Sequence, residues 1–506
     1  MEGFTVAYHR HFIYVCSLMS KQTDDFFKNV ISHAKEYGFV FPSSEIYDGL
    51  SAVYDYGQLG VELKNNLKAY WWKAMIQLHE NIVGIDASIF MHPSIWKASG
   101  HVDGFNDPMI DNKDSKKRYR ADQLIEDKIA RYETDGKTDK AQQLQVDLDA
   151  ALNADDLPRL KSIIEEHNIV CPISGTRNWT EVRQFNLMFS TQMGASAEGA
   201  DTVYLRPETA QGIFVNFLNV QKSGRMKIPF GIAQIGKAFR NEVIARQFIM
   251  RMREFEQMEL QFFVRPGTEL EWYEKWKEVR LKWHLAIGGS PTKYRYHDHV
   301  KLAHYANAAV DIEYQFPFGF KEVEGIHSRT DFDLSQHQKY SGKKLQYFDP
   351  EINQNYVPYV VETSIGLDRL FLTVFCNSFE EQDLSTEGKQ DSRSVLHFHP
   401  TLAPVKAAVL PLTKKDGLPD KAREILNRLK MDYNVHYDEK DSIGKRYRRQ
   451  DAIGTPFCIT VDYQSLEDDT VTLRHRDSME QERVAASELE KIIGELVSWK
   501  NLLTAL

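Results

Sequence analysis

Cysteine is scarce in this chain of 506 residues, and its four copies are scattered. Cys16, Cys171, Cys376 and Cys458 include no CxxC pair. Paired cysteines are the usual signature of a structural zinc site, and a dense set of cysteines is typical of a disulfide-stapled secreted domain. The sequence therefore predicts neither a zinc ion nor a disulfide framework, and it favours a reduced, cytoplasmic protein.

Long apolar runs and an excess of basic charge are also missing. No apolar run in the sequence approaches the ~20 residues of a membrane-spanning helix, so no contact with a membrane is expected. The formal net charge is −9, so a nucleic acid must be met by local basic patches rather than by a global field. A hydrophobic content of 42% and a charged content of 27% are typical of a soluble globular protein. The length allows about two to four domains.

The first 20 residues differ from the rest of the chain. The string HRHFIYVCSLM has a basic start and a short apolar run, but no small-residue cleavage site follows it, as a signal peptide would require. We therefore predict an N-terminal extension over residues 1–20, with Met1 or Met19 as the true start.

The stretch around which the chain is organised is residues 229–259, PFGIAQIGKAFRNEVIARQFIMRMREFEQME. Before the central loop apolar residues are interleaved with small and polar ones, and after it Phe248, Met250, Met252 and Phe255 alternate with Ile249, Arg251, Arg253 and Glu254. This period of two predicts two strands of a hairpin with one face on a core. Buried charge is costly unless it is paired or liganded, so the charges of this stretch point to a ligand with both anionic and cationic parts, such as a nucleotide plus an amino acid. These charged residues are Arg240, Glu242, Arg253, Glu256 and Glu259.

Four ordered strings in the sequence resemble those of one enzyme family. They are RPETAQGIF at residues 206–214, FRNE at 239–242, REFEQME at 253–259 and ETSIGLDR at 362–369. Together they resemble the class II aminoacyl-tRNA synthetases, and most closely the homodimeric glycyl-tRNA synthetases. The resemblance covers nearly the whole chain from about residue 26. It implies the joining of glycine to ATP as glycyl-adenylate with release of pyrophosphate, followed by transfer of glycine to the 3′ end of tRNA(Gly).

The resemblance also implies an α+β fold, built on a mostly antiparallel sheet with flanking helices. A catalytic core is expected over residues 21–398 and an anticodon-binding α/β domain over residues 399–506. The charged residues 121–168 are expected to form a helical insertion. From the pattern alone, the helix before residue 80 and the strand expected at residues 82–90 fit an ordinary core as well as a dimer element. The family's motifs 1, 2 and 3 are expected over residues 61–93, 229–259 and 359–375.

The site residues follow from the same resemblance. Arg240 and Arg369 are expected to be catalytic, with Arg240 on the α-phosphate and the glycine carboxylate and Arg369 on the far phosphates. Glu322 is the expected ligand of Mg²⁺. The residues expected around glycine are Arg120, Glu208, Phe255, Glu256, Gln257, Met258, Glu259, Glu362, Thr363, Ser364, Ile365 and Gly366. Those expected around ATP are Arg240, Asn241, Glu242, Met250, Arg251, Met252, Arg253, Glu254, Phe255, Glu322, Val323, Arg329, Gly366, Leu367, Asp368 and Arg369.

Three of these assignments have simpler alternatives. Arg120 ends a basic run that would serve equally as a solvated face. Glu208 precedes an expected helix, where a carboxylate can act as an N-terminal cap. The basic string at residues 445–449 suits phosphate contact and base stacking in tRNA, but it could also be a solvated loop or a helix cap. Its members are Lys445, Arg446, Tyr447, Arg448 and Arg449.

Other functions fit the sequence less well. A non-catalytic accessory subunit that binds nucleic acid would be free to lose Arg240 and Arg369, which this chain keeps inside family-like strings. A class II ligase for serine or threonine would lack the REFEQME and ETSIG strings. Paired acids also occur in glycosidases, but the accompanying arginines and the absence of an aromatic sugar platform argue against one.

Overall fold

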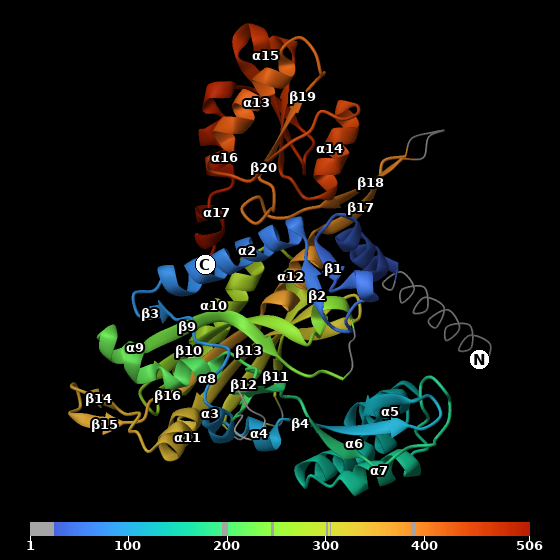
Figure 1. The fold of residues 1–506 in the computed structure, drawn as a ribbon, viewed down its shortest axis with the longest axis vertical. Coiled ribbons are helices and arrows are strands. Elements are labelled where there is room, and N and C mark those ends of the chain that lie inside the picture. Colours follow the sequence, from blue (N-terminus) through green and yellow to red (C-terminus); the bar gives the residue numbers. More distant parts are fainter. Residues whose placement is uncertain (1–24, 195–200, 244–246, 300–301, 304, 386–390) are drawn as a thin grey trace, which may run out of the picture.

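The computed structural model describes residues 25–194, 201–243, 247–299, 302–303, 305–385 and 391–506. The predicted N-terminal extension, with Met1 and Met19, lies outside these residues. The described chain forms a central sheet with its helices, an insertion and a C-terminal region, each with its own hydrophobic core (Figure 1).

The central sheet confirms the expected α+β core. Its strand order is β11 (Tyr294–Asp298), β12 (Ala308–Phe316), β13 (Gly319–Thr330), β16 (Tyr359–Gly366), β10 (Glu254–Val264), β9 (Phe230–Phe239) and β3 (Ile82–Gly84). Neighbouring strands are antiparallel, except that β3 pairs with β9 in parallel.

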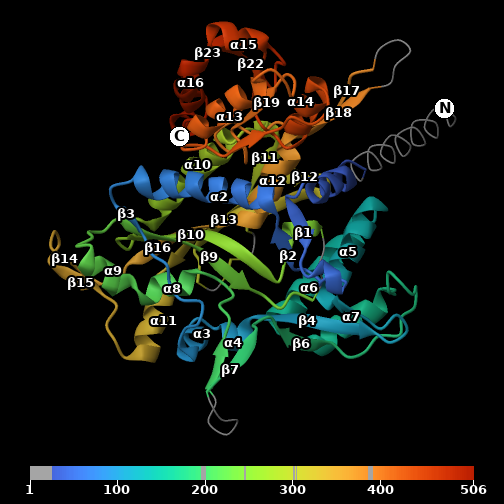
Figure 2. The same ribbon diagram turned by 45° about the horizontal axis from the view of Figure 1, so that its top comes forward.

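Helices cover the two faces of this sheet unequally, and this positions the site. Helices α2 (Gln58–Trp72), α10 (Glu269–Ala286) and α12 (Leu367–Ser378) pack against one face and bury the main core (Figure 2). On the other face, α8 (Ala210–Val215), α9 (Phe217–Ser223) and α11 (Phe332–Ser341) bury a smaller apolar cluster at one end of the strands. The rest of that face is left for polar side chains.

Two strand predictions are wrong in their extent. The second strand of residues 229–259 begins at Glu254, because Gln247 and Phe248 take left-handed φ angles of 64° and 59° and residues 248–250 form a short 3₁₀ turn. This turn lets Ile249, Met250 and Met252 all enter the main core, which an alternating strand would not allow. The strand expected at residues 82–90 is also shorter, since β3 covers only Ile82–Gly84 and Phe90 forms an isolated bridge with Leu205.

The insertion is a small unit of its own. A sheet with the order β5 (Lys117–Arg120), β4 (Asn106–Asn112) and β6 (Arg183–Asn186) carries α5 (Ala121–Thr134), α6 (Thr138–Asn153) and α7 (Leu157–Glu166). Its core runs from Ile110 to Val182, so the packed unit is wider than the charged residues 121–168. In Figure 1 it lies apart from the helices that cover the sheet.

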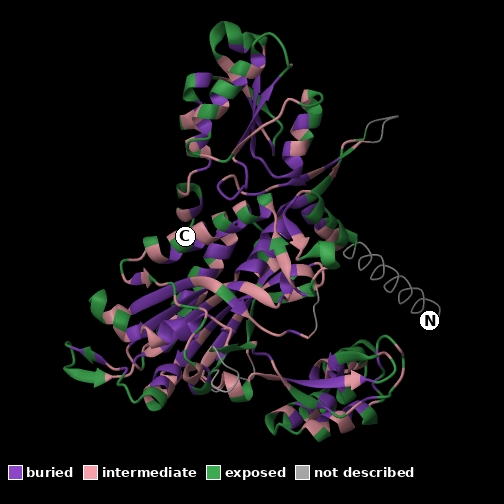
Figure 3. Cartoon of the chain, in the orientation of Figure 1, coloured by how far each residue is buried: buried purple, intermediate pink, exposed green. Residues whose placement is uncertain are grey.

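The C-terminal region is a mixed sheet with helices. The sheet order is β20 (Val435–Tyr437), β19 (Ala407–Pro411), β21 (Phe457–Val461), β22 (Thr470–His475) and β23 (Gln481–Ala485), flanked by α13 (Leu418–Leu429), α14 (Ile443–Ala452), α15 (Tyr463–Asp468) and α16 (Leu489–Leu496). Its interior strands are buried, whereas the outer faces of its helices are exposed (Figure 3).

This region is anchored on the rest of the protein, and its residues Leu402, Ala403, Val405 and Ile453 belong to the main core. Asp451 of α14 accepts hydrogen bonds from Arg474 at 2.8 Å and from Arg393 at 2.7 Å, and Arg393 lies on the hairpin of β17 (Phe379–Asp383) and β18 (Ser392–Leu396). The terminal helix α17 (Lys500–Leu503) turns back and places Leu502 in the main core.

The described chain also has a helix at residues 25–36. Short elements connect the larger ones. They are β1 (Val40–Pro42), β2 (Tyr54–Tyr56), α3 (Pro93–Ala98), α4 (His101–Gly104), β7 (Ser190–Met193), β8 (Asp201–Tyr204), β14 (Tyr347–Asp349) and β15 (Gln354–Tyr356). Among the described helices, none has the length and apolar character needed to cross a bilayer.

Candidate active site

The open face of the sheet carries a polar patch at its centre. Gln257, Glu259 and Gln261 alternate along β10, so they point to the same face. Their partners across the ladder are Gly366, Ser364 and Glu362 of β16 and Gly236, Gln234 and Ile232 of β9. Residues directly opposite on antiparallel strands share a face, so the register of three strands assembles the patch.

Glu259 and Glu362 are buried and linked through one amide. Gln261 donates from Nε2 to Glu259 at 3.0 Å and to Glu362 at 2.6 Å. Thr209, at the start of α8, donates its hydroxyl to the other oxygen of Glu259. The two carboxyl groups are thereby fixed side by side.

Glu362 is held in its charged form by basic neighbours. His327 Nδ1 lies 2.9 Å from its Oε1, and Arg329 Nη1 lies 2.9 Å from its Oε2. Burial alone would raise the pKa of Glu362, but Arg329 and His327 outweigh it and hold the pKa well below the usual range.

Glu208 joins the cluster from the loop before α8. It accepts a hydrogen bond from Gln211 at 2.9 Å and faces His101 Nε2 at 3.4 Å. Its burial opposes ionisation, yet His101 and Arg329 together lower the pKa of Glu208 to about 2. Glu208 is therefore a second carboxylate of this cluster.

Glu259 behaves in the opposite way. Burial raises its pKa well above the usual range, and the nearby carboxylates of Glu362 and Glu208 raise it further. The cluster thus confines two charged carboxylates, Glu208 and Glu362, beside the carboxyl group of Glu259. Such a site is suited to a small cation such as an ammonium group.

A pocket with arginines opens beside this acid cluster. Arg240 follows β9 directly, donates from Nε to the Pro207 carbonyl at 3.1 Å, and places its guanidinium 5.2 Å from the centre of the Phe255 ring and 5.4 Å from that of Phe105. The residues that line the pocket are Arg240, Glu242, Ile249, Met250, Arg251, Met252, Phe255, Gln257, Glu322, Ser364, Gly366, Asp368 and Arg369.

Arg369 and Glu322 form the far side of this pocket. Arg369, in the first turn of α12, pairs with the Glu322 carboxylate at 3.0 Å and donates to the Met250 carbonyl at 3.3 Å. The charge of Arg369 lowers the pKa of Glu322 against the effect of burial. The Glu322 side chain is 48% exposed, so its carboxylate offers oxygen to a hard cation such as Mg²⁺.

A second hollow continues from this pocket toward the insertion. It is lined by Arg120 and Gln123 on one side and by Lys321, Glu322 and Arg369 on the other. Arg120 itself is paired with Asp122 at 2.5 Å and Asp107 at 3.2 Å.

Strand alternation places several residues expected at the ligands on the opposite face. Glu256 pairs with Lys64 at 2.7 Å and Lys68 at 2.6 Å on α2, away from the acid cluster. Because Glu256 and Glu259 are three positions apart in one strand, they cannot share a face. Other strand residues turned into the interior in this way are Met258, Val323, Thr363 and Ile365. Leu367, at the start of α12, is buried in the main core, and Met252 packs into that core while it borders the pocket.

Asp368 serves the packing of the core. It accepts hydrogen bonds from the Tyr56 hydroxyl at 2.5 Å, Lys64 at 2.8 Å and the backbone N–H of Glu256 at 2.8 Å. These three bonds join α12 to β2, α2 and β10. Its carboxylate is fully engaged although it borders the pocket.

Four more residues predicted at the ligands are bonded within the protein. Arg253 donates to the carbonyl of Glu242 at 2.9 Å, and Glu254 pairs with Lys237. Arg329 is buried between Asp333 and Glu362, behind the acid cluster rather than on the side of Arg369. The backbone N–H of Asn241 donates to the carbonyl of Leu187 at 2.7 Å.

The basic string at residues 445–449 lies on helix α14, and most of it is engaged internally. Arg446 is buried and donates to the carbonyls of Pro411 at 2.5 Å and Leu412 at 3.1 Å. Arg448 pairs with Asp391, Arg449 pairs with Asp438, and the Tyr447 hydroxyl lies 2.6 Å from that of Thr460. Lys445 is exposed.

Four residues of the site were not predicted from the sequence. Gln261 has the same parity as Glu259 along β10, so alternation could have found it. His101, Phe105 and His327 come from distant segments, and no local pattern links them to the acids.

Three protein-family models match the chain. The "tRNA synthetase class II core domain (G, H, P, S and T)" matches residues 189–378, and the "Anticodon binding domain" matches residues 406–496. The "Glycyl-tRNA synthetase insertion domain 1" matches residues 107–144 and 136–187. The three matched ranges fall, in this order, on most of the central sheet, on the C-terminal sheet and on the insertion.

Curated relatives match over nearly their whole length. A glycine–tRNA ligase of Chlorobaculum tepidum is 56% identical over 92% of this chain and 98% of its own. Glycine–tRNA ligases of Staphylococcus haemolyticus and Staphylococcus aureus are 54% and 53% identical, over 93% and 94% of this chain and 99% of their own.

Proposed function

The chain belongs to the glycine–tRNA ligases, with a class II synthetase core, and from this membership we propose that its open sheet face activates glycine with ATP and then passes it to tRNA(Gly). One observation carries the assignment of this face. The buried acid cluster of Glu208, Glu259 and Glu362 lies beside the pocket of Arg240 and Arg369, which suits a small ammonium next to phosphates.

The reaction has two steps, and neither needs a covalent bond to the enzyme. An oxygen of the glycine carboxylate attacks the α-phosphorus of ATP, and pyrophosphate leaves as the glycyl-adenylate forms. A terminal ribose hydroxyl of tRNA then attacks the glycyl carbonyl, loses its proton, and AMP leaves. Positioning and charge stabilisation supply the rate in such reactions.

The acid cluster provides the specificity for glycine. Its carboxylates fix the ammonium, and the hydrogen bonds through Gln261 and Thr209 keep them from moving apart. A methyl group on Cα would overpack such a rigid site at a cost of about 1–3 kcal/mol. Glycine is therefore favoured over alanine and serine.

The arginine pocket binds the nucleotide. Arg240 bridges the α-phosphate and the glycine carboxylate as a planar donor of two hydrogen bonds, and the Phe255 ring beside it offers a stacking surface. Arg369 meets the far phosphates. Glu322 holds Mg²⁺, which supplies charge neutralisation on the phosphates when it is bound.

The insertion and the C-terminal region contact tRNA. The hollow between Arg120 and Arg369 leads from the insertion to the pocket, so it is a suitable path for the 3′ end. Within residues 445–449, the exposed Lys445 is the side chain available for tRNA, whereas Arg446 supports α14. We assign the enzyme to the cytoplasm, which its few and scattered cysteines favour.

The enzyme works as a homodimer. Apolar side chains are exposed along α2 and just after it, with Val61 41%, Trp72 38% and Leu78 52% exposed. Val61 and Trp72 are about three helical turns apart, so they lie on one face of α2. This face is suited to contact with a second copy.

Amino-acid-dependent exchange between pyrophosphate and ATP tests the proposal without tRNA. We expect exchange with glycine and little with alanine or serine. Exchange that is equally fast with alanine would refute the role of the acid cluster in specificity. No exchange with any of the three, from folded protein, would refute the proposed chemistry.

A further inference from the structure

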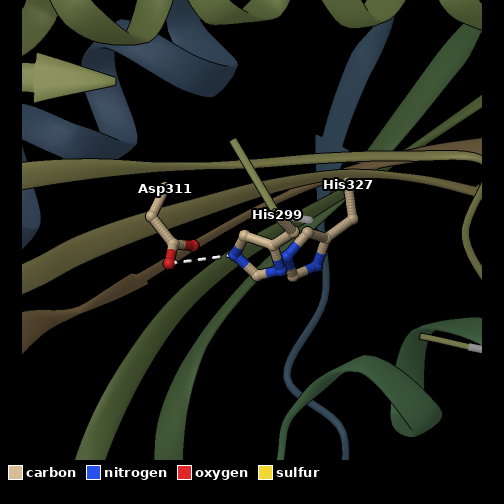
Figure 4. A group of neighbouring side chains, drawn as sticks. All are labelled: His299, Asp311 and His327. Atoms are coloured by element: carbon tan, nitrogen blue, oxygen red, sulfur yellow. Dashed lines mark ion pairs between the residues drawn. The ribbon is translucent and has the colours of Figure 1, made fainter. Parts of the chain in front are cut away.

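Two histidines and one aspartate lie close together (Figure 4), and one of them, His327, also contacts Glu362 of the acid cluster. His299 follows β11 directly, Asp311 lies on β12 and His327 on β13, and their ligand atoms lie within 4.8 Å of one another. His299 Nε2 is 2.9 Å from an oxygen of Asp311. No CxxC string or metal-spaced histidine motif in the sequence predicts this group, since its members come from three separate segments of the chain.

The backbone holds the three side chains in place. Asp311 stands opposite Gly325 in the β12–β13 ladder, and His327 stands opposite Ala309. The N–H of His299 donates to the carbonyl of Ala309 at 3.1 Å. The group is thus mounted on two adjacent strands rather than on a long loop.

Gly325 leaves a gap into which the ligand atoms face. A Cβ atom added at this glycine would lie 3.4 Å from His327 Nε2 and 3.5 Å from Asp311 Oδ1. Both atoms therefore border the same small space. A larger residue at position 325 would fill it.

The second nitrogen of His327 is already committed. His327 Nδ1 lies 2.9 Å from the Glu362 carboxylate, which identifies Nδ1 as the proton donor and leaves the lone pair on Nε2. A histidine whose outer nitrogen donates to a carboxylate is the usual arrangement of a metal-ligating histidine.

We propose that His299, Asp311 and His327 bind one divalent cation of the Zn²⁺ type through His299 Nε2, the Asp311 carboxylate and His327 Nε2. Two imidazoles and a carboxylate suit Zn²⁺ or Co²⁺, whereas Mg²⁺ prefers oxygen alone. Zinc–nitrogen bonds of about 2.0–2.1 Å require ligand atoms roughly 3.3 Å apart, so small side-chain rotations close the site. The proton between His299 and Asp311 leaves as the cation enters.

The cation would act on glycine through His327. A metal on Nε2 makes the Nδ1–H of His327 a stronger donor, which holds Glu362 in place as a carboxylate. The binding of the metal does not depend on the proposed reaction, whereas this effect on glycine does. The two parts therefore need separate measurements.

Titration of the full-length, metal-stripped protein with Co²⁺ and Zn²⁺ tests the site. Replacing His9 and His11 with alanine in every variant removes the histidines of the N-terminal string from the count. We expect one Zn²⁺ per chain by calorimetry, visible Co²⁺ absorption, and no displacement by millimolar Mg²⁺. His299→Ala and Asp311→Asn should each weaken binding by at least about 10- to 100-fold.

Two further variants separate ligand loss from misfolding. Gly325→Ala keeps all three ligands but fills the gap, so it should weaken binding while preserving the circular dichroism spectrum. His475→Ala removes a histidine that pairs with Glu482 at 3.0 Å on the C-terminal sheet, and it should bind as the parent does. Equal metal binding by the parent, His299→Ala and Gly325→Ala, or no stoichiometric binding by the parent, would overturn the site.

Exchange kinetics test the link to glycine. Saturating Zn²⁺ should lower the KM for glycine several-fold in the parent protein and leave the KM for ATP unchanged. The same addition should have no effect on Gly325→Ala. If Zn²⁺ binds without changing the KM for glycine, the site stands and the link to Glu362 is overturned. If exchange fails in the parent with and without Zn²⁺, the proposed reaction is refuted and the binding result is unaffected.

Discussion

At the scale of single residues, the environment gives identical side chains different properties. Glu208, Glu259 and Glu362 are all buried glutamates of one cluster, yet Arg329 and His101 keep two of them charged while Glu259 keeps its proton. Sequence reasoning could name these three acids as candidates. It could not assign their charge, since that depends on partners far away in the chain.

The raised pKa of Glu259 predicts a stability effect that depends on pH. Unfolded Glu259 ionises above a pKa of about 4.3, whereas the folded group stays protonated to a higher pH, so folding costs about 1.4 kcal/mol per unit of raised pKa once the pH exceeds both values. Glu259→Gln removes this cost. We expect its melting temperature to rise relative to the wild type between pH 4.5 and pH 8, as scanning calorimetry without glycine would measure.

Glu254→Gln is the matched control for that comparison, because Glu254 also lies on β10 but pairs with Lys237 at the surface. Its melting temperature relative to the wild type should not depend on pH in the same range. A Glu259→Gln variant that loses stability as the pH rises would contradict the protonated state of Glu259.

Arg240 is expected to speed the reaction by holding a positive charge where negative charge develops in the transition state. Loss of one such preorganised donor typically lowers kcat about 10²- to 10³-fold. Arg240→Ala should therefore lower glycine-dependent pyrophosphate exchange by that factor. Arg159→Ala, which removes an arginine paired with Glu166 on α7, should exchange normally. Near-normal exchange by Arg240→Ala would remove it from the mechanism.

At the scale of elements, β10 divides two functions between its faces. Glu259 faces the acid cluster, while Glu256 faces Lys64 and Lys68 of α2. The existence of this strand and its parity could be predicted from the sequence, and the spacing of three between the two acids already implied opposite faces. Its start could not, because the apolar residues Phe248, Met250 and Met252 also recur at every second position, and only tertiary packing draws residues 248–250 into a turn.

The same limit applies to helix α14. The string KRYRR is basic and aromatic, as a tRNA contact would be, but the fold buries Arg446 against strand carbonyls and pairs its neighbours with acids. Local composition does not reveal which charges have partners elsewhere.

The buried ion pair between Asp368 of α12 and Lys64 is expected to contribute strongly to the free energy of unfolding. Asp368→Ala leaves Lys64 and the Glu256 N–H without this partner, and breaking a buried pair typically costs about 3–5 kcal/mol. We expect a clear loss of stability in urea unfolding. Asp25→Ala removes a surface pair with Lys28 and should cost at most about 1 kcal/mol. Equal stability of the two variants would contradict the structural role of Asp368.

Two residues of helix α14 are expected to have different roles, Arg446 in stabilising the fold and Lys445 in contacting tRNA. Lys445→Ala should raise the KM for tRNA(Gly) in aminoacylation and leave both pyrophosphate exchange and the melting temperature unchanged. Arg446→Ala should lower the melting temperature, since two buried carbonyls lose their donor. A Lys445→Ala variant with normal KM for tRNA would exclude Lys445 from tRNA binding.

At the scale of the whole molecule, the C-terminal region is anchored on the main core, which includes its residues Leu402, Val405 and Ile453. The main core, the insertion core and the C-terminal core each bury their own apolar residues, and Asp451 and α17 connect the C-terminal part to the sheet. The sequence predicted this order of parts from composition and resemblance. It did not predict that the last helix returns to the main core.

The exposed face of α2 predicts the state of association. Light scattering after size exclusion should give about twice the chain mass of 58.6 kDa at micromolar concentration. Trp72→Glu should shift the protein toward the monomer, because it places a charge in an apolar contact. Val146→Glu, at an exposed apolar position of α6, should remain dimeric. A Trp72→Glu variant that is as dimeric as the wild type would place the interface elsewhere.

The alternation of β10 also decides which genetic changes the chain tolerates. Deleting or inserting one codon between Glu256 and Glu259 would exchange the two faces beyond that point, turning apolar side chains toward glycine and acids toward the core. Length changes of the same size are absorbed at the Gly136 turn between α5 and α6, outside the sheet. Related genes should therefore vary in length within the insertion and keep a constant residue count from Arg253 to Val264.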